Sequence, residues 1–414
     1  MPCRRAATRS PASPSFHPKT LTMQHFDPTQ AGPLRDVRVL DLSRLVAGNM
    51  LSLQLADFGA DVIKIEREGR GDDLRSWREA GQPIYWKIYG RNKRSLVLDL
   101  KSGEGLATLR RLVRHAHVLI ENFVPGGLEK MGLAPEALHQ INPRLVIARV
   151  SGWGQTGPYS HKPGFGTLVE AMSGFAHLNG FADRPPVLPP LALADMIAGV
   201  YGAAGVLTAL RVAERDGVGQ IVDLSLFEPI FSVIASEAAK HQLTGRPTER
   251  SGNQSSHTAP RNVYACGDGQ FIALSGSMQS MAMRILDTIG RPELKEDPRF
   301  IDNDARVRHR DELDAIIGGF LAARSRDESL ALFEAAGVTA GPVCTAGELL
   351  THPYALGREA IVQMEDADMG SVPMHNVVPR LSASPGGLRR PAPAVGEHTA
   401  EILAELDHLD AQHD

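Results

Sequence analysis

The chain has 414 residues and a formal net charge of −4. Two or three domains are expected at this length, and no basic stretch indicates nucleic-acid binding. No run of about 18 apolar residues free of charge and proline predicts a transmembrane helix. The three cysteines, Cys3, Cys266 and Cys344, are too far apart for a disulfide framework or a zinc site, so we expect a reducing, cytoplasmic compartment.

Residues 1–22 differ in composition from the rest of the chain. They are rich in Arg, Ser and Pro and contain no acidic residue, which loosely fits a transit peptide. Four prolines oppose the amphipathic helix that such a peptide needs. We therefore expect a disordered tail, with Met23 as an alternative start.

The first ordered segments predict a βαβ unit. A strand over 37–42 and a helix over 48–58 are followed by a strand over 62–65. This order implies a parallel sheet with a right-handed crossover. The alternation continues and predicts an α/β, Rossmann-like domain, with strands at 96–100, 118–120 and 145–148 and a helix over 106–113.

The remaining segments indicate a second, smaller domain. Residues 151–194 are rich in Gly and Pro and are typical of a functional loop region. The predicted elements that follow are a helix over 195–215, a strand over 222–226, a loop over 250–270, a strand over 271–274, helices within 278–336, and a loop-rich end with a helix over 399–406. We predict a small domain at 235–340 and a large domain built from 23–234 and 341–414.

Common cofactor motifs are missing. The turn Ser43–Gly48 offers one glycine where a dinucleotide-binding turn needs G-x-G-x-x-G, which argues against NAD. No P-loop occurs, and the scattered histidines predict no metal site.

Asp195 is the only charged residue between Pro185 and Leu210. A carboxylate in an apolar stretch is costly unless it is paired, capped or used. It suits the N-cap of a helix, but it also suits a base or a nucleophile. The residue pattern alone leaves these alternatives open.

Polar and aromatic side chains follow two of the predicted strands. Arg67 comes after one strand, and Asn122 and Phe123 come after another. Ligands bind at the carboxyl ends of parallel strands in open α/β sheets. A cation, an amide and an aromatic ring suit a nucleotide-like ligand, although a surface charge and a helix-start turn are the alternatives.

Several motifs resemble one known family. Gly59-Ala-Asp-Val-Ile-Lys-Ile-Glu66, Asn92-Lys-Arg-Ser95, Glu121-Asn-Phe-Val-Pro-Gly126 and Gly396-Glu-His-Thr399 are similar to the family III CoA-transferases, which include formyl-CoA transferase. The resemblance runs from about residue 34 to Thr399. It implies a Rossmann-like large domain, a small domain and an interlocked homodimer. It also implies a coenzyme A thioester as substrate, with no permanently bound cofactor and no metal.

The resemblance also implies roles for particular residues. Asp195 falls on the family's nucleophile, which forms an aspartyl anhydride and then an aspartyl-CoA thioester. Val46 and Lys130 stand where formyl-CoA transferase has Gln and Arg. The implied CoA contacts are Val46, Ala47, Arg67, Leu98, Asn122, Phe123 and Lys130, and the implied acyl-pocket aromatics are Trp77, Tyr85 and Trp153.

The expected activity is exchange of CoA between an acyl-CoA and a free carboxylic acid. A related 2-methylacyl-CoA racemase would use Asp195 as a base with an upstream His, but Phe165 stands at that position and cannot accept a proton. An inactive CoA-binding partner subunit is the third alternative. Cations in the acyl pocket would indicate a dicarboxylate substrate, and Arg184 and His257 are the candidate cations. The family resemblance favours a succinyl-type donor.

Overall fold

A computed structural model describes Leu21 and residues 23–412. The predicted disordered tail, 1–22, lies outside the described residues apart from Leu21. The chain divides into two compact units. One comprises Asp27–Val343 with Val377–Asp414, and the other joins the N-terminal segment up to Phe26 with Cys344–Asn376.

The larger unit is built on a six-stranded, fully parallel sheet with the strand order β4-β3-β2-β5-β6-β7. This sheet confirms the predicted α/β, Rossmann-like fold. The strands are β2 (Arg38–Asp41), β3 (Asp61–Glu66), β4 (Lys93–Val97), β5 (Val118–Glu121), β6 (Val146–Ser151) and β7 (Ile221–Ser225).

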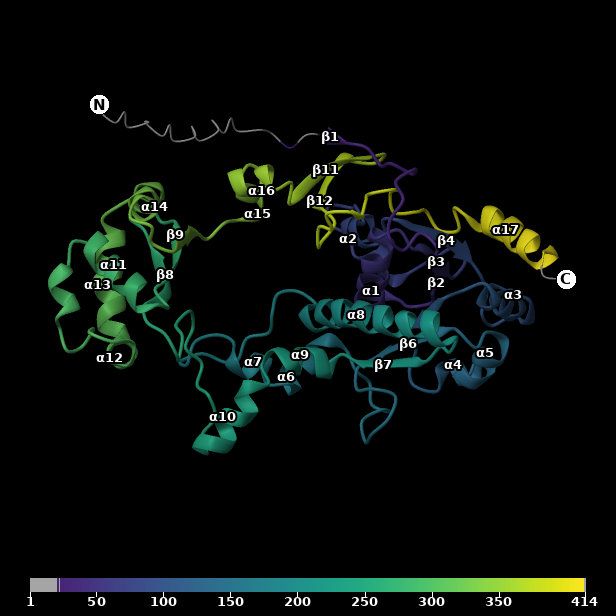
Figure 1. Cartoon of the computed structure of the whole chain (residues 1–414), viewed down its shortest axis with the longest axis horizontal. Helices are drawn as coiled ribbons and strands as arrows, with labels where there is room; N and C mark the ends of the chain where they lie inside the picture. The colour runs from purple at the N-terminus through teal and green to yellow at the C-terminus, as the bar shows by residue number, and fades with distance from the viewer. Residues whose placement is uncertain (1–20, 22, 413–414) are drawn as a thin grey trace, which may run out of the picture. The chain divides into compact units, whose positions relative to one another are not determined.

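Helices cover both faces of the sheet. Alternate strand residues point to opposite sides, and apolar side chains on both sides are buried beneath these helices. Val39 and Val62 face a core that includes α1 (Leu45–Asp57) and α8 (Leu193–Asp216). Leu40 and Ile63 face the opposite core, which includes α3 (Gly103–Arg114), α5 (Pro135–Ile141) and α17 (Thr399–Ala411). Figure 1 shows α1 and α8 beside each other on one face of the sheet.

The strand order reverses between β2 and β5. The chain adds β3 and β4 on one side of β2, and then returns to add β5, β6 and β7 on the other side. Ligands in open α/β sheets bind in the crevice at such a switch point, outside the carboxyl ends of the strands. In this chain the loops that begin at Leu42 and Asn122 border that crevice.

The strand predicted at 96–100 is wrong by three residues, since β4 begins at Lys93. Two charged residues, Lys93 and Arg94, begin this buried strand, and both of them have partners. Lys93 Nζ donates to Asn49 Oδ1 at 2.8 Å. Arg94 donates to Asp61 Oδ2 at 2.8 Å and to Glu405 Oε1 at 2.7 Å. Paired charges are tolerated at buried positions where isolated charges are not.

A three-stranded antiparallel sheet lies mostly within the predicted small domain, and its last strand runs past residue 340. The strands are β8 (Arg261–Ala265), β9 (Phe271–Ser275) and β10 (Ala340–Pro342). The loop predicted over 250–270 is therefore wrong at β8. Phe300, Ile317 and Phe333 are fully buried in a separate core of this region. Its helices are α11 (Gln279–Thr288), α12 (Asn303–Arg308), α13 (Arg310–Ala322) and α14 (Arg326–Ala335). The boundaries 235–340 remain a prediction.

The second unit contains another three-stranded sheet, where a loop-rich end was predicted. Its strands are β1 (Met23–Gln24), β11 (Ile361–Asp366) and β12 (Gly370–His375), and its short helices are α15 (Ala346–Leu349) and α16 (Pro353–Gly357). Met364 and Val372 pair across β11 and β12 and are buried, so alternating apolar residues mark these strands.

The remaining helices of the larger unit are short and lie near its loops. They are α2 (Ile84–Tyr89), α4 (Gly127–Lys130), α6 (Gly166–Met172), α7 (Phe175–Leu178), α9 (Phe227–Val233) and α10 (Ser236–Thr244). Within the described residues, α8 alone is long and apolar enough by length and composition to cross a membrane. It packs against α1 as a core helix of this unit.

Candidate active site

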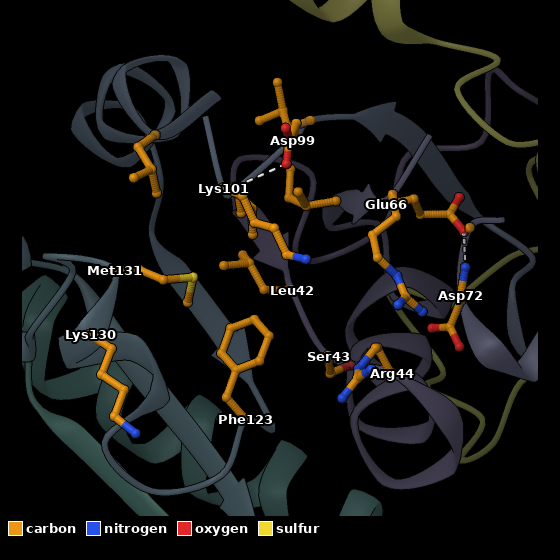
Figure 2. A pocket seen from close by; sticks show the side chains of 16 residues that line it. Leu42, Ser43, Arg44, Glu66, Asp72, Asp99, Lys101, Phe123, Lys130 and Met131 are labelled. Carbon is orange, nitrogen blue, oxygen red and sulfur yellow. Dashed lines mark hydrogen bonds between the residues drawn. The ribbon is translucent and has the colours of Figure 1, made fainter. Parts of the chain in front are cut away.

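Two cavities meet at the switch point and share a wall formed by Arg44 and Phe123. The first, here called the cationic cavity, has a volume of about 490 Å³ and is shown in Figure 2. The second, here called the aspartate cavity, has a volume of about 420 Å³. Lining residues include Arg67, Leu98, Lys101 and Lys130 in the cationic cavity, and Ala47, Asn122, Trp153, His161, Lys162 and Asp195 in the aspartate cavity.

A cluster of three arginines lies at the edge of the cationic cavity, and two of them, Arg44 and Arg67, line it. Asp73 is paired with Arg44 at 3.4 Å, Arg67 at 3.1 Å and Arg70 at 2.9 Å. One carboxylate cannot neutralise three guanidinium groups, so positive charge is left over for an anion. Lys101 also extends into this cavity (Figure 2). Apolar walls beside fixed cations suit a ligand with both phosphate and apolar parts.

The turn after β2 is held in a strained shape. Leu45, the first residue of α1, has a φ of +63°, which is uncommon for a residue with a branched side chain. Asp72 Oδ1 accepts the Leu45 N–H at 3.0 Å. Asn122 accepts the Arg44 N–H at 2.9 Å and donates to the Arg44 carbonyl at 2.8 Å. The Asn122 amide thus fixes the loop backbone between the two cavities.

A buried charge network lies beneath this turn. Lys64 Nζ is 3.1 Å from Asp41 Oδ1 and 2.9 Å from Asp72 Oδ2, and all three side chains are fully buried. Burial works to raise the pKa of Asp72, but the Lys64 ammonium and hydrogen bonds from Leu45, Leu74 and Asn49 outweigh it and lower the pKa to about 2. These carboxylates are therefore fixed, ionised supports of the turn.

Asp195 lies in the first turn of α8. The helix begins at Leu193 after Ala192, so the N-cap alternative is wrong. The capping role falls to Glu170, which is buried and accepts the Ala194 N–H at 3.0 Å. Ala47, in the first turn of α1, places its backbone N–H near the Asp195 carboxylate, where it acts to lower the pKa of that group. The starts of two helices thus converge on one half-buried carboxylate.

The environment of Asp195 favours its neutral form. Burial is the main cause, the Glu170 charge is the second, and together they raise the pKa of Asp195 to about 6. The N–H groups of Ala47 and of Asp195 itself oppose this rise only in part. A carboxylate held at this pKa is ionised at neutral pH and is more basic than an exposed one.

Gly166 and Phe165 close one side of the carboxylate. A Cβ added at Gly166 would collide with Asp195 Oδ2, so only glycine lets the backbone approach this closely. Phe165 lines the aspartate cavity and is 64% exposed. Its ring has no group that takes up a proton, in agreement with the argument against a racemase.

The structure brings most of the predicted site residues together. Ala47, Asn122, Phe123, Trp153 and Asp195 line the aspartate cavity, and Arg67, Leu98, Phe123 and Lys130 line the cationic cavity. Three predicted residues line neither. Val46 is buried against Leu74 and Trp86. Trp77 and Tyr85 pack edge to face at 5.4 Å and are partly exposed.

Sequence reasoning missed Arg44, Asp73, Glu170, His161 and Lys162. Arg44 follows the first strand of the sheet, where the same argument that selected Arg67 would have found it. Glu170 stands between Val169 and Met172, so it is another carboxylate in an apolar setting. Lys162 lies in the Gly- and Pro-rich loop and carried no signal of its own. Among the described residues, no cluster of three His, Cys, Asp or Glu side chains could hold a metal ion.

Comparison with known proteins agrees with this geometry. The model of CoA-transferase family III matches residues 34–399. The chain is 42% identical to succinyl-CoA–D-citramalate CoA-transferase of Chloroflexus aurantiacus, over 90% of this chain and 94% of the relative. It is 36% identical to succinate–glutarate CoA-transferase of Agrobacterium fabrum, over 92% and 98%. The crystal structure of a CaiB/BaiF family protein from Brucella suis superimposes with a TM-score of 0.81 at 34% identity, over 91% and 100%.

The chain therefore belongs to CoA-transferase family III. The family resemblance drawn from the motifs is confirmed, and so is the predicted reaction class, CoA transfer between an acyl-CoA and a carboxylic acid. The racemase and the inactive subunit are not favoured.

Proposed function

We propose that Asp195 is the nucleophile of a two-stage CoA transfer. The observation that supports this proposal is the setting of the Asp195 carboxylate, which has no cationic partner among the described residues. Its pKa is raised to about 6, and the Ala47 N–H lies near it. Such a group is ionised at pH 7 yet poorly solvated, which suits attack on a thioester.

The chemistry balances without an external proton donor. Asp195 attacks the thioester carbonyl, the C–S bond breaks, and CoA leaves as a thiolate. The thiolate then attacks the Asp195 carbonyl of the mixed anhydride, which releases the first acid and leaves an aspartyl-CoA thioester. The second acid then attacks the aspartyl-CoA thioester, which forms a new mixed anhydride and releases the CoA thiolate. The thiolate attacks the acyl carbonyl of this anhydride, which yields the new acyl-CoA and frees the Asp195 carboxylate. The Ala47 N–H faces the oxyanion that forms on the Asp195 carbonyl in the middle steps.

Coenzyme A fits the cationic cavity in this proposal. Arg67, Lys101 and Lys130 would hold the phosphates, and Phe123 would contact the nucleotide end. Since Arg44 and Phe123 belong to both cavities, the thioester arm would pass over them toward Asp195. The roles of Val46, Trp77 and Tyr85 as contacts remain predictions, because these side chains lie outside both cavities.

We propose a succinyl-type CoA thioester as the donor and a small carboxylic acid as the acceptor. The relatives from C. aurantiacus and A. fabrum carry succinyl-CoA or succinate in their names. The residues 254–260 lack the glycine run of formyl-CoA transferase, which argues against formyl or oxalate transfer.

We also propose that the chain forms an interlocked homodimer in the cytoplasm. Apolar side chains of α6 and α8 remain between 43% and 49% exposed, and a second copy would cover them; they are Leu168, Met172, Val200, Tyr201 and Leu207. Light scattering on the purified chain should give twice the monomer mass. A monomer with full activity would contradict the dimer.

Peptide mapping tests the nucleophile. The enzyme is incubated with succinyl-CoA and trapped with hydroxylamine or borohydride, and the modified peptide is sequenced by mass spectrometry. We expect the label on Asp195. A label on Glu170 or Asp183, or no label during active turnover, would sink the assignment.

A further inference from the structure

The aspartate cavity contains three basic side chains, which are Arg44, His161 and Lys162. Arg44 lies where the two cavities meet and is paired with Asp73. Lys162 lines only the aspartate cavity, and within the described residues its ammonium makes no ion pair with a carboxylate. A cation left without an acidic partner, in the cavity that receives an acid, points to a charge supplied by the ligand.

The Lys162 ammonium lies over one aromatic ring, which a second ring supports. Its Nζ lies 3.4 Å from the centre of the Tyr159 ring. Tyr159 packs edge to face on Trp153 at 5.7 Å, and Trp153 Nε1 donates to the Pro163 carbonyl at 3.0 Å. A cation over a ring face is attracted to it but is not neutralised, so its charge stays available.

The loop that carries Lys162 is itself closed at its base. The Lys162 N–H donates to the Tyr159 carbonyl at 2.9 Å. At the two ends of the loop, Gly152 and Gly164 lie so close that a Cβ on either would collide with the other backbone. The loop therefore presents Lys162 on a supported turn, which suits recognition of a small ligand.

We propose that Lys162 binds the second carboxylate of a dicarboxylic acid while the first carboxylate reacts at Asp195. This inference rests on the proposed function and adds the residue that recognises the second carboxylate, and with it a short-chain dicarboxylate as the acceptor. His161 lines the same cavity and adds a hydrogen-bond donor beside the ammonium. The phosphates of CoA have their own cations in the cationic cavity, which Lys162 does not line.

The candidates drawn from the sequence, Arg184 and His257, line neither cavity. The Arg184 guanidinium is instead near the Phe181 ring, at 5.7 Å. Arg184 thus provides a matched control, a cation of the same unit that lies outside the site.

The test compares succinate with monomethyl succinate as acceptors, because the ester keeps the chain length and removes the second charge. In Lys162→Met the apolar stem remains over Tyr159. We expect kcat/KM for succinate to fall about 10- to 100-fold, through KM, while kcat/KM for the monoester, which does not depend on the donor half-reaction, is unchanged. Tyr159→Leu keeps the lysine but removes its ring, and we expect a fall of about 2- to 5-fold. Arg184→Met should match the wild type.

Two results would overturn the inference. One is an equal loss for both acceptors, which would make Lys162 a structural residue. The other is a higher KM for the CoA thioester with the preference for succinate intact, which would make it a CoA ligand. If the wild type labels Asp195 but Lys162→Met keeps its preference, only this inference fails. If no aspartyl label forms in the wild type, the proposed function itself fails.

Discussion

Near the switch point, burial is accompanied by opposite pKa shifts in two groups of carboxylates. Asp41 and Asp72 share the Lys64 ammonium, and the pKa of Asp72 falls to about 2. Asp195 has Glu170 as its charged neighbour, and its pKa rises to about 6. Asp41 and Asp72 stabilise the turn at Leu45, whereas Asp195 remains free to react. Pairs of acids whose environments push their pKa values apart mark structural and reactive roles in one site.

The strongest test of this contrast is Asp195→Asn. The amide has the shape of the carboxylate but is a poor nucleophile, so we expect kcat to fall on the order of 10⁴-fold. Thermal stability should stay level or increase, because a poorly solvated charge is removed. Steady-state kinetics and thermal unfolding check both expectations.

Asp183→Asn is the control for this variant, since Asp183 lies outside both cavities. It should retain wild-type kinetics. A variant at Asp195 that is as active as the wild type would remove the contrast altogether.

The second test removes the cation of the structural pair. Lys64→Met leaves Asp41 and Asp72 buried without their partner, and we expect a loss of about 3–5 kcal/mol in the free energy of unfolding. Urea unfolding followed by circular dichroism measures it. Lys101→Met, an exposed lysine of the cationic cavity, should unfold as the wild type does.

The pH dependence of the same pair has a defined sign. The folded pKa of Asp72 is below its unfolded value of 3.8, so its contribution is present above that pH and is lost as the pH falls toward about 2. In Lys64→Met this contribution should vanish, and acid should no longer destabilise the protein through Asp72. Unchanged stability in the variant would mean that the ion pair does not hold the turn.

The third test concerns the neighbour of Asp195. The nucleophile must be ionised, so kcat/KM in the wild type should rise as the pH increases through about 6. Glu170→Gln keeps the acceptor for the Ala194 N–H but removes the negative charge. We expect the acid limb to move to lower pH, with activity below the limb rising by up to about tenfold for each unit of pKa.

A pH profile separates this effect from a structural one. If Glu170 only caps α8, Glu170→Gln will keep the wild-type limb. Glu170→Ala should lose the cap as well, and should lower thermal stability by about 1 kcal/mol.

The sequence predicted the sheet and Asp195 because both depend on local patterns. Apolar strand residues alternate with helices, and one carboxylate interrupts an apolar stretch. Arg94 lies inside β4 because Asp61 and Glu405, far away in the sequence, neutralise it. The Ala47 N–H reaches Asp195 only because α1 packs on α8. Contacts between distant segments decide such features, and no local pattern reports them.

The smallest expected effect concerns Arg67, which is half exposed and shares Asp73 with two other arginines. Solvent and salt screen such a charge, so Arg67→Met should raise KM for the CoA thioester only about 3- to 10-fold, with kcat unchanged and the effect weakening at high salt. Arg70 pairs with the same carboxylate but lines neither cavity, so Arg70→Met should change KM less. If Arg70→Met had the larger effect, the phosphates would lie outside the cationic cavity. In that case the arginines paired with Asp73 would not form the anion site of the cationic cavity. Asp73 would serve only to position side chains that bind the ligand elsewhere.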